Sequence, residues 1–219
     1  MIQAVILAAG SRPAASLVGL ALDALLEAGV KDAVVVTGPD GAAIQTALAR
    51  RFDLNVAAVE NRDVHAGTLA SVAAVAHLVD DDFLLIDGDL IFEPALVSRL
   101  LGPGTRLAID PTRALDDDAV KVAAEGERIV SIGTCLAPFQ RVAGESIGMA
   151  KIDIATGDRL FVVARRLLDA GLRHLRYEAA FEALIDEGEV FEMADITGLR
   201  WRAIRDDGAF QFHVGRAIA

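Results

Sequence analysis

A short apolar run near the middle of the chain most constrains how it can fold. Phe83-Leu84-Leu85-Ile86 is followed directly by Asp87-Gly88-Asp89. An apolar run of this length is typical of a strand buried on both faces, as in the middle of a parallel sheet. Ligands of open α/β sheets bind just beyond the carboxyl ends of such strands, so the two carboxylates stand where a metal carrying a phosphate would be held. Asp and Gly are also common turn residues, and a plain turn is the alternative interpretation.

The first ninety residues alternate between short apolar strands and helices. We expect strands at 2–7, 33–37, 55–59 and 83–86, and helices at 17–28, 42–51 and 69–79. Gly29 follows the first helix where a C-terminal glycine commonly stands. The alternation is the signature of βαβ units and predicts a parallel sheet with right-handed connections.

The pattern changes after Asp89. A short helix at 93–101, a strand at 106–110, a hairpin of 119–123 and 128–132, and a strand at 146–152 are expected next. Helices at 156–170 and 177–187, short strands at 190–193 and 199–204, and a last helix at 208–217 complete the prediction. The C-terminal half is therefore a mixed α+β elaboration of an α/β core, and we expect the sheet to continue with at least one antiparallel strand.

Composition excludes several classes of partner. With 21 Lys and Arg against 32 Asp and Glu, the formal net charge is −11, which argues against nucleic-acid and anionic-membrane partners. No apolar run approaches the roughly 18 residues of a membrane span, and no basic segment precedes the first apolar run. The single cysteine, Cys135, excludes an internal disulfide. We therefore expect a cytoplasmic protein without membrane insertion.

Polar residues at strand ends and in loops form the candidate site. The small-residue loop at 8–13 lies between a strand and a helix, an arrangement that lets backbone N–H groups approach a phosphate. Lys121 interrupts an apolar strand; it either meets an anion or lies exposed on an outer face. Glu145 and Ser146 lie between glycines at a strand start, where a turn is the alternative. Tyr177-Glu178 opens a helix, where a glutamate also complements the helix dipole.

Four segments occur in the same order in one protein family. They are Leu7-Ala8-Ala9-Gly10, Gly88-Asp89-Leu90-Ile91-Phe92, Lys121-Val122 before a hairpin ending in Ile132-Gly133, and Gly144-Glu145-Ser146-Ile147-Gly148-Met149. With them the chain resembles, over essentially its whole length, the sugar-phosphate nucleotidyltransferase-like superfamily. It is most similar to phosphocholine and inositol-1-phosphate cytidylyltransferases with a MobA-like NTP transferase domain. Tyr177-Glu178 and the late strand around Trp201 also match.

The resemblance implies a Rossmann-like, three-layer α/β domain with a mostly parallel sheet. Residues 1–110 would form its nucleotide-binding half and residues 111–219 its acceptor-binding half. The implied reaction is Mg²⁺-dependent: a phosphate oxygen of a phospho-alcohol or sugar phosphate attacks the α-phosphorus of an NTP, CTP in the nearest branch, and pyrophosphate leaves. A homodimer, or fusion to a second domain, is also compatible with the family.

Site residues follow from the same match. Lys121 and Asp89 would be catalytic, and Asp89 and Asp206 would hold Mg²⁺. Acceptor-binding residues would be Glu145, Ser146, Tyr177 and Glu178, where carboxylates could meet a choline-like cation. Nucleotide-binding residues would be Leu7, Ala8, Ala9, Gly10, Ser11, Arg12 and Asp87.

The chain also departs from the family pattern at the site. The first loop is short, and Ala203 and Arg205 stand where Glu-x-Asp is expected, which leaves Asp206 one position late. A one-residue slip in a strand places a side chain on the opposite face. Two alternatives to a cytidylyltransferase therefore stay open: a catalytically impaired or inactive binding or regulatory domain on the same fold, and a sugar-1-phosphate nucleotidyltransferase.

Overall fold

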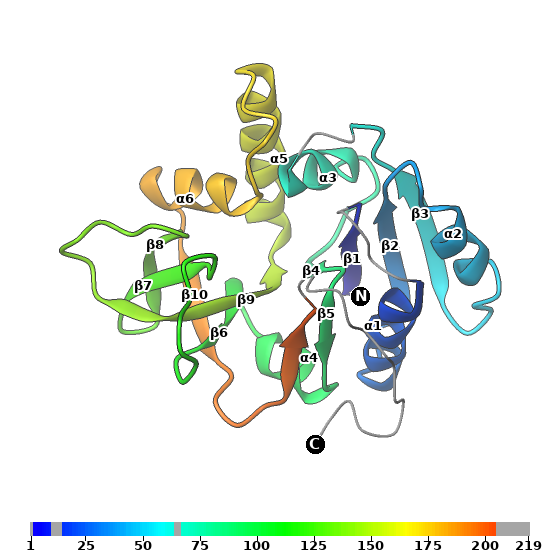
Figure 1. Cartoon of the computed structure of the whole chain (residues 1–219), viewed down its shortest axis with the longest axis horizontal. Coiled ribbons are helices and arrows are strands. Elements are labelled where there is room, and N and C mark those ends of the chain that lie inside the picture. The colour runs from blue at the N-terminus through cyan, green and yellow to red at the C-terminus, as the bar shows by residue number, and fades with distance from the viewer. Residues whose placement is uncertain (1, 10–14, 64–66, 205–219) are drawn as a thin grey trace.

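The computed structural model describes residues 2–9, 15–63 and 67–204. In this part of the chain a nine-stranded sheet forms the centre of the fold (Figure 1). The strand order is β3-β2-β1-β4-β9-β6-β10-β8-β7. The first four strands are parallel to one another, as expected: β1 (Gln3–Ala8), β2 (Asp32–Thr37), β3 (Asn55–Glu60) and β4 (Phe83–Asp87). The residues from Phe83 to Ile86 are all fully buried, which confirms a central strand covered on both faces.

The antiparallel continuation of the sheet is also confirmed. Strand β9 (Val142–Ile152) runs antiparallel between β4 and β6 (Thr105–Asp110). The predicted hairpin consists of β7 (Lys121–Glu125) and β8 (Arg128–Gly133), and β10 (Phe191–Asp195) lies between β8 and β6. Strand β7 also pairs with the first part of β9, so the hairpin curls back onto the sheet.

Helices cover both faces of the sheet and make three layers. Alternate residues of β1 divide between two hydrophobic clusters, with Val5 and Leu7 in one and Ala4 and Ile6 in the other. The first cluster includes residues of α3 (Thr68–Ala74), α5 (Ile154–Asp169) and α6 (Glu178–Asp186), which lie together in Figure 1. The second includes residues of α1 (Ala15–Glu27), α2 (Ala42–Leu48) and α4 (Ala95–Leu100). This is the mixed α/β architecture expected from the sequence.

A separate two-stranded sheet, β5 (Leu90–Phe92) with β11 (Trp201–Ala203), was not expected as such. The apolar run continues past Asp89, but the chain turns there. The Gly88 N–H donates to the Leu7 carbonyl at 3.0 Å, and a Cβ at Gly88 would lie 2.7 Å from that oxygen. This close approach to β1 redirects the chain, and Asp89 lies in the turn between β4 and β5.

Several predicted boundaries were wrong at the ends of elements. The helix expected to reach residue 79 ends at Ala74, after which short turns such as Leu78 N–H to Val75 carbonyl replace the helical bonds. The strand expected from residue 146 begins at Val142, because β7 and β6 pair with its first residues. The last helix, expected at 208–217, lies outside the described residues. Within the described part of the chain, no helix has the length and apolar character needed to cross a membrane.

Candidate active site

Several of the candidate residues that the structure describes lie near the carboxyl ends of β1, β4 and β6. Asp87 is the last residue of β4, and Asp89 follows it in the turn. Asp110 ends β6, on the other side of the antiparallel β9. This edge is where open α/β sheets bind ligands.

Asp87 lies in a buried and crowded position. Burial raises the pKa of its carboxyl well above the ordinary range, and the charges of Glu178 and Asp89 raise it further, while Arg176 and a hydrogen bond from Tyr177 act in the opposite direction. Its Oδ1 atom is buried without a hydrogen-bond partner among the described residues. Such an orphaned acceptor is costly unless a cation or a donor from a ligand meets it.

Gly148 makes room for this carboxylate. It has φ +80° in the middle of β9, and a Cβ there would lie 2.4 Å from Asp87 Oδ2. A side chain at position 148 would therefore be strained by its backbone and would also collide with Asp87.

The start of α6 brings three polar residues to Asp87. Tyr177 is the N-cap residue of α6, and its N–H donates to Thr68 Oγ1 at 3.0 Å. Arg176 donates to both carboxylate oxygens of the buried Glu178, at 3.0 and 3.3 Å, and its Nη2 lies 3.8 Å from Asp87 Oδ2. Burial alone would lower the pKa of Arg176, but the charges of Glu178 and Asp87 outweigh it and raise that pKa. The opening of a helix by Tyr177-Glu178 is confirmed, with Tyr177 as the N-cap residue and Glu178 as the first residue of α6.

A second polar cluster lies at the end of β6. Asp110 is opposite Glu145 of β9 in the strand register, and the indole N–H of Trp201 donates to Asp110 Oδ2 at 2.9 Å. Arg113 lies 3.7 Å from the buried Glu145 carboxylate, and its guanidinium is 4.6 Å from the centre of the Trp201 ring. Partial burial would raise the pKa of Asp110, but hydrogen bonds from Thr112 and Trp201 hold it below the ordinary value.

Lys121 is the cross-strand neighbour of Glu145, on β7. Its ammonium donates to the carbonyl of Thr134 at 2.8 Å and to those of Asp117 and Ala119 at 3.4 Å. Lys121 is half-buried, and this burial is compatible with both alternatives. A phosphate contact of Lys121 stays a prediction.

Comparison with known proteins identifies the family to which the chain belongs. Residues 13–186 match the family described as the MobA-like NTP transferase domain. The chain belongs to this family. It is also similar to the CMP-5'-(3-aminopropyl)phosphonate synthase of Streptomyces rubellomurinus (strain ATCC 31215), at 26% identity over 196 residues, which cover 82% of the chain and 30% of that protein. The chain thus spans less than a third of this relative's length.

Solved structures of nucleotidyltransferases share the fold. The inositol-1-phosphate CTP transferase from T. maritima superimposes with a TM-score of 0.80 at 18% identity, over 93% of this chain and 89% of that one. The CTP:phosphocholine cytidylyltransferase from Streptococcus pneumoniae gives a TM-score of 0.69 at 15% identity, over 93% of each chain. At these identities the likeness confirms the predicted Rossmann-like fold.

The other residues expected in the nucleotide-, acceptor- and metal-binding sites are placed only in part. Leu7 and Ala8 are buried in β1, and Ala9 follows at its end. Ser146 is half-buried in β9 and opposite Ile109 in the register. Gly10, Ser11, Arg12 and Asp206 lie outside the described residues.

The carboxylates beside β4 suit a magnesium ion. Among the described residues, no three or more His, Cys, Asp or Glu side chains gather in a group that could hold a metal. Mg²⁺ needs fewer, because one or two carboxylates together with substrate phosphates usually bind it. Asp89, with the orphaned Oδ1 of Asp87 beside it, supplies oxygen donors of that kind.

Sequence reasoning missed Asp110, Arg113 and Arg176. Asp110 carried the same signal as Asp87, a carboxylate at the end of an apolar strand. The two arginines carried none, because a lone arginine in a polar segment follows no periodicity, and its partners come from other elements.

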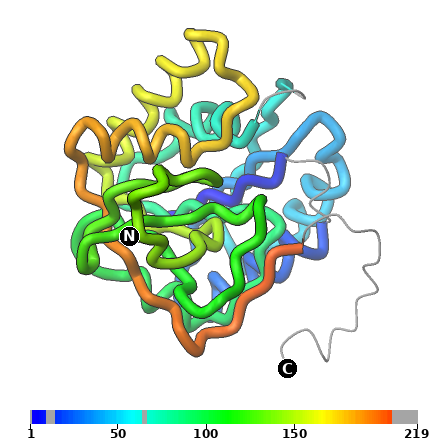
Figure 2. The backbone as a smooth tube through the Cα atoms, turned by 60° about the vertical axis from the view of Figure 1, so that its left-hand side comes forward, coloured from blue at the N-terminus to red at the C-terminus, as the bar shows by residue number. Residues whose placement is uncertain are grey.

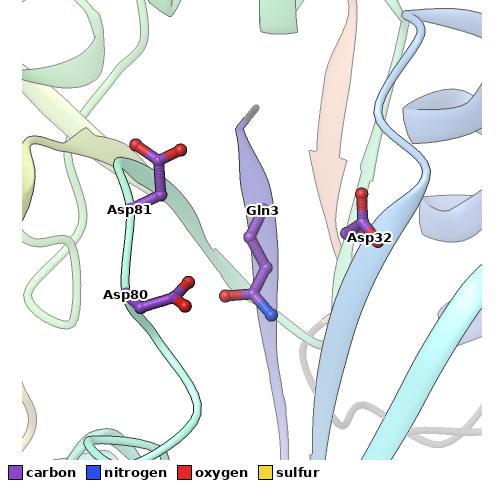
Figure 3. A pocket seen from close by; sticks show the side chains of 4 residues that line it. All are labelled: Gln3, Asp32, Asp80 and Asp81. Atoms are coloured by element: carbon purple, nitrogen blue, oxygen red, sulfur yellow. The ribbon is translucent and has the colours of Figure 1, made fainter.

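A pocket of about 240 Å³ lies at the opposite end of the sheet (Figure 3). Gln3, Asp32, Asp80 and Asp81 line it, and the first two open β1 and β2. This is the amino end of the parallel strands, whereas the carboxylates described above lie at the carboxyl end. We therefore place no part of the candidate active site in this pocket.

Proposed function

We propose that the protein transfers a nucleotidyl group, with Mg²⁺, from an NTP to a phosphorylated alcohol of the phosphocholine or inositol-1-phosphate type and releases pyrophosphate. CTP is the proposed donor, and a cytoplasmic location is part of the same proposal. The observation that carries it is the carboxylate pair Asp87 and Asp89 at the end of the central strand of a MobA-like domain. The names of three relatives, which use CTP or form CMP conjugates, support the choice of nucleotide.

In this proposal the chain mainly positions reactants and balances charge. Residues 1–110 bind the nucleotide, with the loop from Leu7 to Arg12 around its phosphates and Lys121 as a cationic contact. Asp89 and Asp206 would hold the metal ion, with Asp87 Oδ1 as a further oxygen donor beside Asp89, and the ion would neutralise phosphate charge. Residues 111–219 hold the acceptor, through Glu145, Ser146, Tyr177 and Glu178. This arrangement suits phosphoryl chemistry, because alignment and electrostatics supply most of the rate enhancement.

The bond changes are simple. An oxygen of the acceptor phosphate forms a bond to the α-phosphorus of the nucleotide, and the bond from that phosphorus to the bridging oxygen of pyrophosphate breaks. The acceptor oxygen is already ionised at neutral pH, so no protein base is needed to activate it. The raised pKa of Asp87 is a consequence of burial in this scheme and not a proton-transfer device.

One observation favours a catalytically impaired binding domain as a second candidate. Ala203 pairs with Leu90 across the β5–β11 sheet, and the Ile204 N–H donates to the carbonyl of Asp89 at 2.9 Å. Alanine, and not the carboxylate that the resemblance expects, therefore stands one residue from the backbone contact with Asp89. If the missing carboxylates at positions 203 and 205 limit the nucleotidyl-transfer rate, the variant Ala203→Glu/Arg205→Asp should raise that rate.

The test is product formation with purified full chain, Mg²⁺ and CTP. Phosphocholine, inositol-1-phosphate, 3-aminopropylphosphonate and glucose-1-phosphate are offered in turn, and the other NTPs are offered with each. We expect one cytidylylated product that disappears when EDTA replaces Mg²⁺. A preference for glucose-1-phosphate would instead support a sugar-1-phosphate nucleotidyltransferase. A folded protein that forms no product with any pair would support the binding-domain alternative.

A further inference from the structure

The carboxylates expected to meet a cationic acceptor are already paired with arginines. Glu178 is 5% exposed, and the Arg176 guanidinium binds both of its oxygens. A bidentate pair of this kind is strong and geometrically specific. Glu178 therefore offers little uncompensated negative charge to an ammonium group.

The second carboxylate, Glu145, also lies beside an arginine, Arg113. Glu145 is 3% exposed, and Arg113 is the cation beside it at 3.7 Å. The same guanidinium lies over the ring of Trp201, the chain's single tryptophan. The indole N–H is used by Asp110, and the ring packs against the apolar cluster of its own sheet face.

Quaternary ammonium groups are usually recognised by open aromatic faces together with uncompensated carboxylates. Here Arg113 occupies the tryptophan face, and Tyr177, the chain's single tyrosine, is 2% exposed. The guanidinium of Arg113 therefore lies where a quaternary ammonium group of a ligand would contact the Trp201 ring.

The two arginine–carboxylate pairs stand on either side of β9. Arg176 reaches Asp87 at the end of β4, and Arg113 follows the end of β6. On β9, Gly148 lies against Asp87 and Glu145 lies beside Arg113. These two positions are three residues apart on β9, close to an irregularity in its pairing with β6, so both arginine–carboxylate pairs flank one short stretch of this strand. Both guanidinium groups are about half-exposed, and each has five N–H donors, so donors remain for a ligand.

We propose that Arg113 and Arg176 set the acceptor specificity of the reaction proposed above, on which this inference rests. They favour an acceptor whose non-reacting end carries hydroxyl or anionic groups, as in a polyol phosphate. They disfavour an acceptor that ends in a quaternary ammonium group, because Arg113 and Arg176 compete for the same carboxylates and aromatic face.

Binding and turnover test this proposal separately. Calorimetry measures inositol-1-phosphate and phosphocholine binding to the full chain with Mg²⁺ and a non-hydrolysable CTP analogue, and pyrophosphate release gives kcat/KM for both acceptors with CTP. The unchanged chain should prefer inositol-1-phosphate. Arg113→Gln exposes Trp201 and Glu145, and should improve phosphocholine binding relative to inositol-1-phosphate about tenfold. The double variant Arg113→Gln/Arg176→Gln should shift the ratio further.

The control is Arg166→Gln, which removes an arginine that pairs with Glu187 on the exposed side of α5 and α6. It should leave the ratio unchanged. A preference of the unchanged chain for phosphocholine, or a ratio that neither variant moves, would overturn the proposal. If the double variant does not fold, the acceptor ratio of Arg113→Gln alone tests the proposal, because the Arg113 side chain is half-exposed. Absence of turnover with every acceptor would count against the proposed reaction, whereas the binding ratio would still decide the specificity.

Discussion

At the scale of single residues, the site depends on how Asp87 is accommodated. Its carboxylate is buried beside two other acids, and Arg176 and Tyr177 offset part of the resulting repulsion. The absence of a side chain at Gly148 provides the space. Glycine is therefore needed at position 148 both for its positive φ and because it has no side chain.

Gly148→Ala tests this packing. The positive φ should cost about 1–2 kcal/mol of unfolding free energy for an alanine, and the new methyl should displace the Asp87 carboxylate and reduce activity. Urea denaturation and nucleotidyl-transfer rates measure the two effects. Gly171→Ala is the matched control, because Gly171 has φ +83° and a Cβ added there would meet no atom within 4 Å. If both variants lost the same stability and kept the same activity, the proposed contact with Asp87 would be contradicted.

The sequence singled out the acids of the candidate site and missed Arg113 and Arg176. Asp87 and Asp89 end an apolar strand, and Tyr177-Glu178 opens a helix, so local pattern was enough to single them out. Pairing of Arg176 with Glu178 depends on side-chain direction at a helix start, and pairing of Arg113 with Glu145 depends on the register of β6 and β9. Neither is visible as a motif.

At the scale of elements, local pattern predicted most of the strands and helices. The first four strands and their connecting helices followed from apolar runs and helical spacing. The β5–β11 sheet did not, since Leu90–Phe92 continues an apolar run and its partner lies more than a hundred residues away. Long-range pairing, and not propensity, decides such short strands.

The start of α5 gives a prediction for stability. Asp153 is its N-cap residue and accepts from the Thr156 N–H at 3.1 Å and from Thr105 Oγ1 at 2.6 Å. Partial burial would raise the pKa of Asp153, but these hydrogen bonds outweigh it and lower that pKa. Asp153→Ala should cost about 1–2 kcal/mol of unfolding free energy at neutral pH.

The direction of the pKa shift of Asp153 determines how this stabilisation depends on pH. Because the folded-state pKa of Asp153 is lowered, its charge stabilises the fold above the unfolded-state pKa of about 3.9, and the contribution is lost as the pH falls through the folded-state value. Asp153→Asn keeps a capping side chain but removes the charge. The stability difference between the unchanged chain and Asp153→Asn, from urea denaturation, should shrink below about pH 4. A constant difference from pH 7 to pH 3 would contradict the assignment.

At the scale of the whole molecule, one sheet joins the two proposed halves. Strand β9, from the acceptor half, lies between β4 and β6 of the nucleotide half, and Figure 2 follows the backbone through both halves. The division at residue 110 thus stays a proposal about function and does not follow a break in the sheet. Candidate residues of both halves, such as Asp87 in β4 and Glu145 in β9, therefore lie in one sheet.

The measurement that tests the central claim most directly is Mg²⁺-dependent pyrophosphate release from CTP with the preferred acceptor. The unchanged chain, Asp89→Ala and the control Asp169→Ala, which changes an exposed residue at the end of α5, are compared at equal folded concentration. We expect Asp89→Ala to lower the rate about a hundredfold or more, because loss of a metal ligand removes several kcal/mol of charge stabilisation, and Asp169→Ala to leave it unchanged. Full activity in Asp89→Ala would contradict the account.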